Sequence, residues 1–223
     1  MADFPYDVVG FDLDGTLLDT ARDLGEALNH ALALAGRPTI PLDEVPGLIG
    51  GGTLQLLRGG LARTGGIDEA QVPQLNEHLV AFYTANIARH TALYPGGEAM
   101  LAELEARGVR IAVATNKREN LARRVFDELG LTHRLATIIG GDTLGPDRAK
   151  PKPDMLIEMV RRTGAVRAAF VGDTSYDIGA ARAAGLPVIA VSFGFCDKPV
   201  HTLGADAVID HFDELIPTLQ RLA

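Results

Sequence analysis

Short apolar runs alternate with helix-like segments along most of this chain, and few architectures accommodate such an alternation. Six runs are apolar on both faces and rich in β-branched residues, as the buried strands of a parallel sheet are. Later gaps carry helix-like segments such as Lys117–Leu129, Asp154–Thr163 and Ile178–Ala184. The pattern predicts an α/β fold with a doubly wound parallel sheet. The six runs are Tyr6–Phe11, Val109–Ala114, Thr137–Gly140, Ala168–Val171, Pro187–Val191 and Ala207–Ile209.

One long interval, between the first and second runs, breaks the alternation. It carries three amphipathic helix patterns and no strand pattern. We therefore expect residues 18–92 to form a helical insert, and residues 1–17 plus 93–223 to form the sheet domain. Tyr94-Pro95-Gly96-Gly97 reads as the turn back to the sheet. The three patterns are Leu24, Ala27, Leu28, Ala31 and Leu32, then Leu54, Leu57 and Leu61, then Leu75, Leu79, Phe82 and Tyr83.

Composition narrows the class of partner. The 223-residue chain has a net charge of −8, which argues against nucleic acid or an anionic membrane surface as the main partner. No apolar run approaches the roughly 20 residues that span a bilayer, and no basic-then-apolar secretory signal is visible at the N-terminus. We expect a cytoplasmic protein that acts on a small molecule, and the composition leaves open whether it is a monomer or a homodimer.

Two acidic residues lie directly after the first run, in the stretch Gly10-Phe11-Asp12-Leu13-Asp14-Gly15-Thr16. Side chains two apart on an extended segment share a face, so Asp12 and Asp14 converge just past the strand end. Two carboxylates this close repel each other unless a cation lies between them, and Mg²⁺ prefers such oxygen ligands. A solvated acidic turn is the alternative, and it is the better interpretation of an isolated Asp-x-Asp-Gly stretch.

A second acidic pair follows the fourth run. Asp173 comes directly after Gly172, and Asp177 lies one helical turn later on the same side of an expected helix. Ligands bind outside the carboxyl ends of the strands in open α/β sheets, so all four acids are expected at one edge. Capping of a helix and stabilisation of its dipole are the alternative roles for this pair.

Neutral and basic donors follow at the same predicted edge. Thr115 and Asn116 come after the second run, at the expected start of a helix, where their side chains and the helix N–H groups suit an anion. Lys150 lies in Ala149-Lys150-Pro151-Lys152-Pro153-Asp154, whose prolines stiffen an extended loop. A lysine on a stiff loop neutralises a phosphate as a point charge. Helix capping and a solvated surface charge are the alternatives.

Together these residues match the requirements of phosphoryl transfer. Cations reduce the repulsion between carboxylates and a dianionic substrate, and hydrogen-bond donors stabilise charge on the equatorial oxygens. A carboxylate nucleophile forms an acyl-phosphate, which divides one difficult displacement into two. The chain has no Gly-Lys-Ser/Thr nucleotide loop and no calcium loop of the helix-loop-helix kind.

Four motifs, in this order, resemble those of the haloacid dehalogenase superfamily of phosphatases. The resemblance covers the whole chain and implies a Rossmann-like core, with the helical insert as the superfamily's cap domain. The motifs are Asp12-x-Asp14-Gly15-Thr16, Thr115-Asn116, Lys150-Pro151-x-Pro153 and Gly172-Asp173-x-x-x-Asp177.

The resemblance also implies a mechanism. Asp12 is then the nucleophile of a Mg²⁺-dependent phosphomonoester hydrolase that acts through an aspartyl-phosphate. Asp14 protonates the leaving oxygen and then deprotonates the attacking water. Asp12, the Asp14 main-chain carbonyl and Asp173 are the implied metal ligands, with Asp177 either a direct ligand or one step removed.

The substrate implied by the resemblance is a small phosphorylated metabolite held by Thr115, Asn116 and Lys150. Within the superfamily the chain is most similar to phosphoglycolate phosphatases. Relatives acting on sugar phosphates, nucleotides or pyrophosphate share such features, so a phosphatase of another small metabolite is the alternative. Asp14 argues against a dehalogenase, and residues 18–92 contain no lysine of the kind a phosphonate-cleaving relative needs. The similar stretches are Leu48-Ile49-Gly50-Gly51-Gly52, Thr115-Asn116-Lys117 and Leu203-Gly204-Ala205-Asp206.

Two rival functions and the choice of leaving group complete the expectations. A phosphomutase would need an aspartyl-phosphate protected from water, and a catalytically silent binding protein would have no need to keep repelling carboxylates. Because the phosphate-binding residues lie on the sheet domain, we expect the insert to select the leaving group. Gly50-Gly51-Gly52 offers backbone amides, and Arg58 or Arg63 offers positive charge for a substrate carboxylate. Solvated surface arginines are the alternative.

Overall fold

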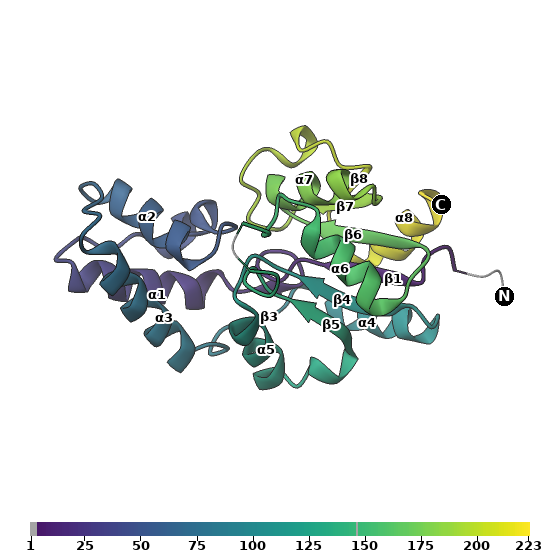
Figure 1. The fold of residues 1–223 in the computed structure, drawn as a ribbon, viewed down its shortest axis with the longest axis horizontal. Helices are drawn as coiled ribbons and strands as arrows, with labels where there is room; N and C mark the ends of the chain where they lie inside the picture. The colour runs from purple at the N-terminus through teal and green to yellow at the C-terminus, as the bar shows by residue number, and fades with distance from the viewer. Residues whose placement is uncertain (1–3, 146) are drawn as a thin grey trace.

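The computed structural model describes residues 4–145 and 147–223, and within them the chain forms a six-stranded parallel sheet (Figure 1). The strands lie in the order β5-β4-β1-β6-β7-β8, and every neighbouring pair is parallel. The six expected strands are confirmed, with bounds within two residues of the prediction. They are β1 Val8–Phe11, β4 Arg110–Ala114, β5 Leu135–Ile139, β6 Ala168–Gly172, β7 Val188–Val191 and β8 Ala207–Ile209.

Helices cover both faces of the sheet, which confirms the doubly wound, Rossmann-like α/β fold. Successive residues of β1 point to opposite faces: Val8 packs in the core beneath α6 and α7, and Val9 packs in the core on the other face. Gly10 lets α6 approach closely, since a Cβ there would lie 2.3 Å from Met159 Sδ. The helices are α4 Gly97–Ala106, α5 Glu119–Glu128, α6 Asp154–Thr163, α7 Ser175–Ala184 and α8 Leu215–Arg221.

The order of the strands reverses beside β1. The chain winds outward through β4 and β5 on one side of β1, then returns to form β6, β7 and β8 on the other. In such sheets the ligand crevice lies outside the carboxyl ends of the strands at the reversal. Asp12 and Asp173 directly follow β1 and β6, so both residues lie at this crevice.

Residues 21–85, which we call the helical region, form α1 (Ala21–Leu34), α2 (Thr53–Arg63) and α3 (Val72–Ala85). Figure 1 shows these helices together at one end of the molecule, beyond the carboxyl edge of the sheet. The predicted apolar face of α1 is buried throughout. The expectation that Leu54 is part of a buried face is wrong, because its side chain opens toward cavities and is 46% exposed. Short 3-10 helices lie at Leu42–Glu44, Pro46–Leu48, Thr132–Arg134, Val200–Thr202 and Phe212–Glu214.

A two-stranded antiparallel sheet lies where the chain enters and leaves the helical region. Strand β2 (Leu18–Asp19) pairs with β3 (Ala92–Leu93), so Leu18 faces Leu93 and Asp19 faces Ala92. The expectation that residues 18–92 hold no strand is therefore wrong. Two-residue strands carry no readable periodicity, because alternation needs about four residues or more to be recognised.

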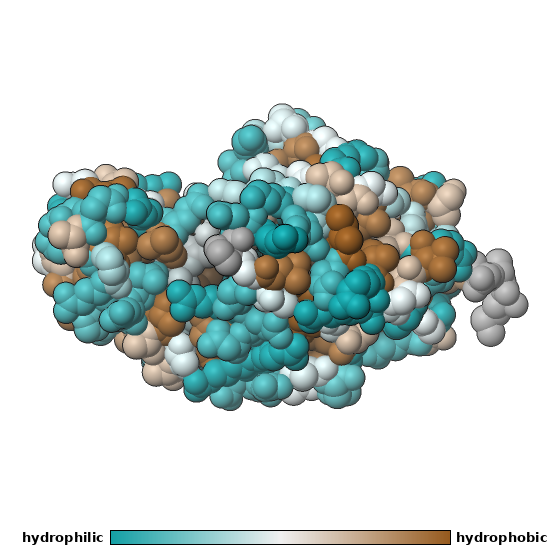
Figure 2. All heavy atoms as spheres, in the orientation of Figure 1, coloured by the Kyte–Doolittle hydropathy of each residue, from teal (hydrophilic) through white to brown (hydrophobic). Residues whose placement is uncertain are grey.

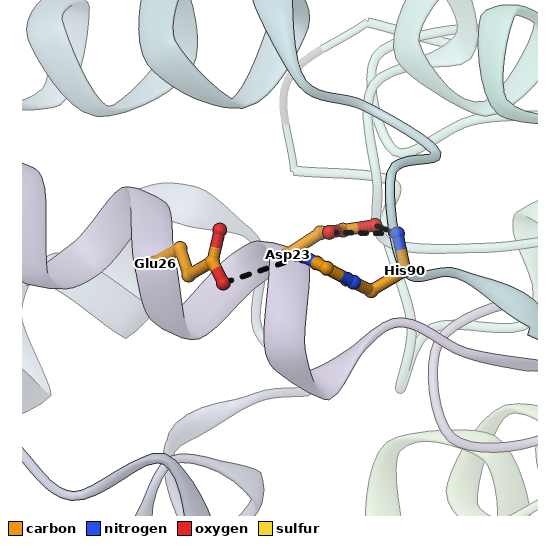
Figure 3. A group of neighbouring side chains, drawn as sticks. All are labelled: Asp23, Glu26 and His90. Carbon is orange, nitrogen blue, oxygen red and sulfur yellow. Dashed lines mark hydrogen bonds and ion pairs between the residues drawn. The ribbon is translucent and has the colours of Figure 1, made fainter.

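Asp23, in the first turn of α1, ties this entry segment to the exit segment (Figure 3). Its buried carboxylate accepts hydrogen bonds from the main-chain N–H groups of His90 (3.0 Å) and Thr91 (2.9 Å) and from the Thr91 hydroxyl (2.7 Å). Glu26 and the His90 ring lie alongside, 3.5 Å apart. Because the Asp23 oxygens are engaged by these donors, the group joins two segments of the chain as a structural element.

The surface is polar in character on the face that Figure 2 shows, with hydrophobic residues in small separate groups over both regions. Among the described residues, no helix combines the length and the apolar character needed to cross a bilayer.

Candidate active site

Three of the four predicted acids converge at the crevice. Asp12 follows β1, Asp173 follows β6, and Asp177 lies in the first turn of α7. One carboxylate oxygen from each lies within 4.8 Å of the others, and all three side chains are buried. Asp14 is not in this group, which we call the acid cluster (Asp12, Asp173 and Asp177).

Lys150 supplies the positive charge inside the acid cluster. Its Nζ lies 2.8 Å from Asp12 Oδ1 and 2.5 Å from Asp177 Oδ1, and the lysine is itself buried. Burial acts to lower the pKa of Lys150, but the two carboxylates outweigh it and raise the pKa above its ordinary value. The ammonium is therefore charged. Lys150 thus pairs with two of the three carboxylates of the acid cluster, and no contact between Lys150 and Asp173 is seen among the described residues.

Two carboxylates of the acid cluster have raised pKa values, because they are buried and lie close to one another. Burial raises the pKa of Asp12 to about 6, opposed by Lys150 and assisted by Asp177. Burial, followed by the charges of Asp177 and Asp12, raises the pKa of Asp173 well above its ordinary value. A further cation would remove these shifts, because an opposite charge nearby favours the ionised carboxylate.

The acid cluster fits a hard divalent cation. Asp12 Oδ1 is buried and accepts no hydrogen bond from any described residue; its contact with Lys150 is an ion pair without hydrogen-bond geometry. Asp173 is oriented on both sides, since its oxygens accept from Thr16 Oγ1 (2.7 Å) and the Phe195 N–H (2.8 Å). Gly15 keeps this space open: its φ is +82°, and a Cβ there would lie 2.4 Å from Asp173 Oδ2. Buried carboxylate oxygens of this kind suit Mg²⁺.

Asp177 has a structural role as well as a place in the cluster. Its Oδ2 accepts from the Thr174 hydroxyl (2.6 Å) and N–H (3.0 Å), which forms a capping box at the start of α7. Its Oδ1 accepts from Lys150. Both oxygens of Asp177 thus accept hydrogen bonds from the protein. Asp177 caps helix α7, as the alternative interpretation had it, and it also orients Lys150.

Asp14 is held separately, at the junction with the helical region. Both of its oxygens accept from Lys117 Nζ, at 2.7 and 2.8 Å, and Oδ1 also accepts from the Thr20 hydroxyl at 2.7 Å. Sequence reasoning missed Lys117 because it was assigned to the start of a helix. The available signal was a lysine directly after two polar residues at a strand end.

Thr115 and Asn116 are placed at the crevice, but not at the start of a helix as expected. Helix α5 begins at Glu119, whose N–H donates to Asp142 Oδ1 at 2.8 Å. The Asn116 side chain instead clamps the backbone of Lys150, accepting from its N–H (2.9 Å) and donating to its carbonyl (3.2 Å). Its amide also donates to the Gly50 carbonyl of the helical region at 3.1 Å.

A cavity of about 470 Å³ opens above these residues, between the sheet edge and the helical region. Asp12, Asp14, Thr115 and Asn116 line it from the sheet side, and Gly50–Gly52 line it from the other. Gly52, with a φ of +82°, is the residue directly before α2.

The two arginines expected to face the substrate do not line this cavity. Arg58 is paired with Glu69 through two hydrogen bonds of 2.7 and 2.6 Å and faces a neighbouring cavity. Arg63 lies 3.7 Å from Glu44. The arginine that does line the cavity is Arg118, an exposed residue directly before α5.

Comparison with known proteins agrees with this geometry. The chain is 41% identical over 207 residues to a protein of Caulobacter vibrioides named phosphoglycolate phosphatase, covering 92% of this chain and 86% of that protein. It is 39% identical over 211 residues to a protein of the same name from Mesorhizobium japonicum, covering 93% and 92%. A crystal structure described as a predicted phosphoglycolate phosphatase from Haemophilus somnus superposes with a TM-score of 0.89 at 27% identity, covering 97% of this chain and 99% of that one.

The model of one protein family, described as haloacid dehalogenase-like hydrolase, matches residues 9–191. The matched segment contains the acid cluster, Lys150, Asp14 and the whole helical region. This chain belongs to the haloacid dehalogenase-like hydrolase family.

Proposed function

We propose that this protein is a Mg²⁺-dependent phosphomonoester hydrolase whose substrate is 2-phosphoglycolate. The observation that carries the proposal is Asp12 Oδ1 at the strand reversal, next to Lys150 and two further acids. This buried carboxylate oxygen accepts no hydrogen bond from the residues that the structure describes. Such an oxygen, whose described polar contact is the ion pair with Lys150, can act as a nucleophile toward phosphorus. The relatives named phosphoglycolate phosphatase support the choice of substrate.

The reaction proceeds in two displacements on Asp12. Its carboxylate attacks phosphorus, the ester P–O bond breaks, and Asp14 gives a proton to the leaving oxygen. A water then attacks the aspartyl-phosphate and loses a proton to Asp14, which releases inorganic phosphate, restores the Asp12 carboxylate and returns Asp14 to its protonated form. Lys150 and the Thr115 hydroxyl would bind the phosphate oxygens.

Asp12, Asp173 and the Asp14 main-chain carbonyl would hold the Mg²⁺. The ion would neutralise the surplus of carboxylates and allow a dianionic phosphate to approach them. Asp177 acts one step removed, through its ion pair with Lys150. Asn116 orients Lys150 by fixing its backbone.

We propose that residues 18–92 form a cap domain that selects the leaving group, with residues 1–17 and 93–223 as the core domain. The sheet edge binds the phosphoryl group of any ester alike, so discrimination has to come from the rest of the cavity. Arg118 offers a cation for the carboxylate of 2-phosphoglycolate, in place of the expected Arg58. Gly50–Gly52 line the cavity from the cap side.

Phosphate release from a panel of small phosphorylated metabolites, with and without Mg²⁺, tests the proposal. We expect Mg²⁺-dependent turnover, with the highest kcat/KM for 2-phosphoglycolate. A higher kcat/KM for a sugar phosphate or nucleotide would identify that ester as the substrate, with the same hydrolytic reaction. No release from any ester, with a chromogenic ester included, would indicate a silent binding protein.

A further inference from the structure

Lys117 is a buried charged residue to which the mechanism above gives no role. Its ammonium lies at hydrogen-bond distance from both oxygens of Asp14, the group assigned to proton transfer. Lys117 is buried, so its side chain is held in this contact with Asp14.

The helical region also contacts Lys117. The ammonium lies 4.8 Å from the centroid of the Tyr83 ring, which comes from α3 and is fully buried. Burial raises the pKa of Tyr83 to about 12, so the ring is neutral and offers its face to the cation. Lys117 thus contacts both the Asp14 carboxylate and an aromatic ring of the helical region.

We propose that Lys117 is a positioning residue that sets the orientation of Asp14 for both proton transfers, with Tyr83 fixing the lysine from the helical region. The inference rests on the proposed function. Two hydrogen bonds from one ammonium define the plane of the Asp14 carboxylate, whereas Thr20 alone would leave it free to rotate. A contribution to folding stability alone would not account for the buried Lys117–Asp14 pair, because the cost of desolvating a buried ion pair offsets much of its attraction.

The test uses Lys117→Met, which keeps the length of the side chain and removes its charge. Lys198→Met is the matched control, because it makes the same chemical change at an exposed lysine far along the chain. With 2-phosphoglycolate we expect kcat to fall roughly 100-fold in Lys117→Met, the size of effect that a small misplacement produces. KM should change little, and Lys198→Met should match the wild type.

A chromogenic ester separates the two steps. The leaving group of 4-nitrophenyl phosphate needs no proton, so its release does not depend on Asp14, whereas hydrolysis of the aspartyl-phosphate still does. Lys117→Met should therefore release close to one nitrophenol per active site in a fast phase, followed by a slow steady rate. Acid-quenched Lys117→Met should accordingly retain more covalent phosphate than the wild type.

A double-mutant cycle tests whether Lys117 acts through Asp14. In an Asp14→Asn background, Lys117→Met should cause no further loss of kcat. A further loss of similar size, or a raised KM with kcat unchanged, would overturn the inference by giving Lys117 an independent or substrate-binding role. Wild-type kinetics in Lys117→Met would also overturn it.

Two controls keep the outcomes distinct. Circular dichroism establishes that each variant is folded; if Lys117→Met is not, Lys117→Gln serves instead, with the same burst expected at smaller size. Wild-type turnover that is lost in Asp12→Asn supports the proposed function whatever Lys117 does. A wild type without turnover would overturn both proposals together.

Discussion

Two lysine–carboxylate pairs lie at the same edge of the sheet, and they differ in their balance of charge. Lys150 faces Asp12 and Asp177, with Asp173 beside them, so carboxylates outnumber the ammonium. Lys117 faces Asp14, and that pair is balanced. The acid cluster around Lys150 needs a further cation before all three of its carboxylates can ionise. The Lys117–Asp14 pair has one ammonium for one carboxylate, so it needs no further cation. In the proposed mechanism the demand for a further cation therefore comes from the acid cluster, whereas the Asp14 side chain is paired with an ammonium of the protein.

The largest expected effect comes from Asp12→Asn, which breaks the first pair. The change is nearly isosteric and removes the nucleophile, so kcat with 4-nitrophenyl phosphate should fall by more than the ~10⁴-fold upper range for an acid–base residue. The protein should stay folded, because the substitution relieves repulsion within the acid cluster. Near-normal turnover in folded Asp12→Asn would exclude the covalent mechanism. Asp14→Asn, its counterpart in the balanced pair, should lose less.

Removal of the metal should lower turnover almost as strongly as Asp12→Asn, through its effect on the acid cluster. A chelator should abolish turnover and added Mg²⁺ should restore it. Ca²⁺ should inhibit, because its higher coordination number and longer bonds let it engage Asp12 without the geometry for attack. Phosphate release after chelation and re-addition is the measurement. Full activity in excess chelator would show that turnover needs no metal. Turnover with Ca²⁺ would show only that coordination geometry does not prevent the attack by Asp12.

A smaller effect is expected at Arg118, which belongs to neither pair. Arg118→Ala should raise KM for 2-phosphoglycolate about tenfold, the equivalent of ~1.4 kcal/mol, and should leave 4-nitrophenyl phosphate nearly unaffected. Arg58→Ala is the control, since its guanidinium is engaged by Glu69 in a neighbouring cavity. Comparing kcat/KM for both esters decides the matter. Equal losses for the two esters would mean that Arg118 does not select the leaving group.

The smallest expected effect is a dependence of folding stability on pH, and it arises from Asp12 in the acid cluster. Burial raises the pKa of Asp12 from its ordinary value of 3.8 to about 6, so between these values the folded metal-free protein binds a proton that the unfolded chain does not. This contribution to stability is present below about pH 4 and is lost as the pH rises through about 6. Mg²⁺ competes with that proton, so it should raise Tm more at pH 8 than at pH 5.

Thermal unfolding with and without Mg²⁺ at the two pH values measures this difference. For a chain of this size each kcal/mol corresponds to about 2–4 °C in Tm. Asp12→Asn provides the control, because it should reduce the pH dependence of the Mg²⁺ effect. An equal rise in Tm at both pH values in the wild type would contradict the role assigned to Asp12.

The sequence was sufficient to predict the sheet and the first pair, for a local reason. Asp12 and Asp173 directly follow buried strands, and parallel strands bring their carboxyl ends to one edge. The second pair depends on contacts that no local pattern records. Lys117 meets Tyr83 across two regions of the chain, and a single lysine in a loop has no periodicity. The sequence offered Arg58 either as a substrate contact or as a surface arginine, and it does not reveal the ion pair that Arg58 forms with Glu69.

The central claim is that Asp12 forms a covalent phosphoenzyme while Asp14 transfers protons. Mass spectrometry of peptides from protein quenched in acid during turnover tests it directly, with Lys117→Met used to enrich the intermediate. We predict one phosphoryl group on the peptide containing Asp12, absent from Asp12→Asn. Phosphate on a different residue, or its absence throughout sustained turnover of the enriching variant, would contradict the claim.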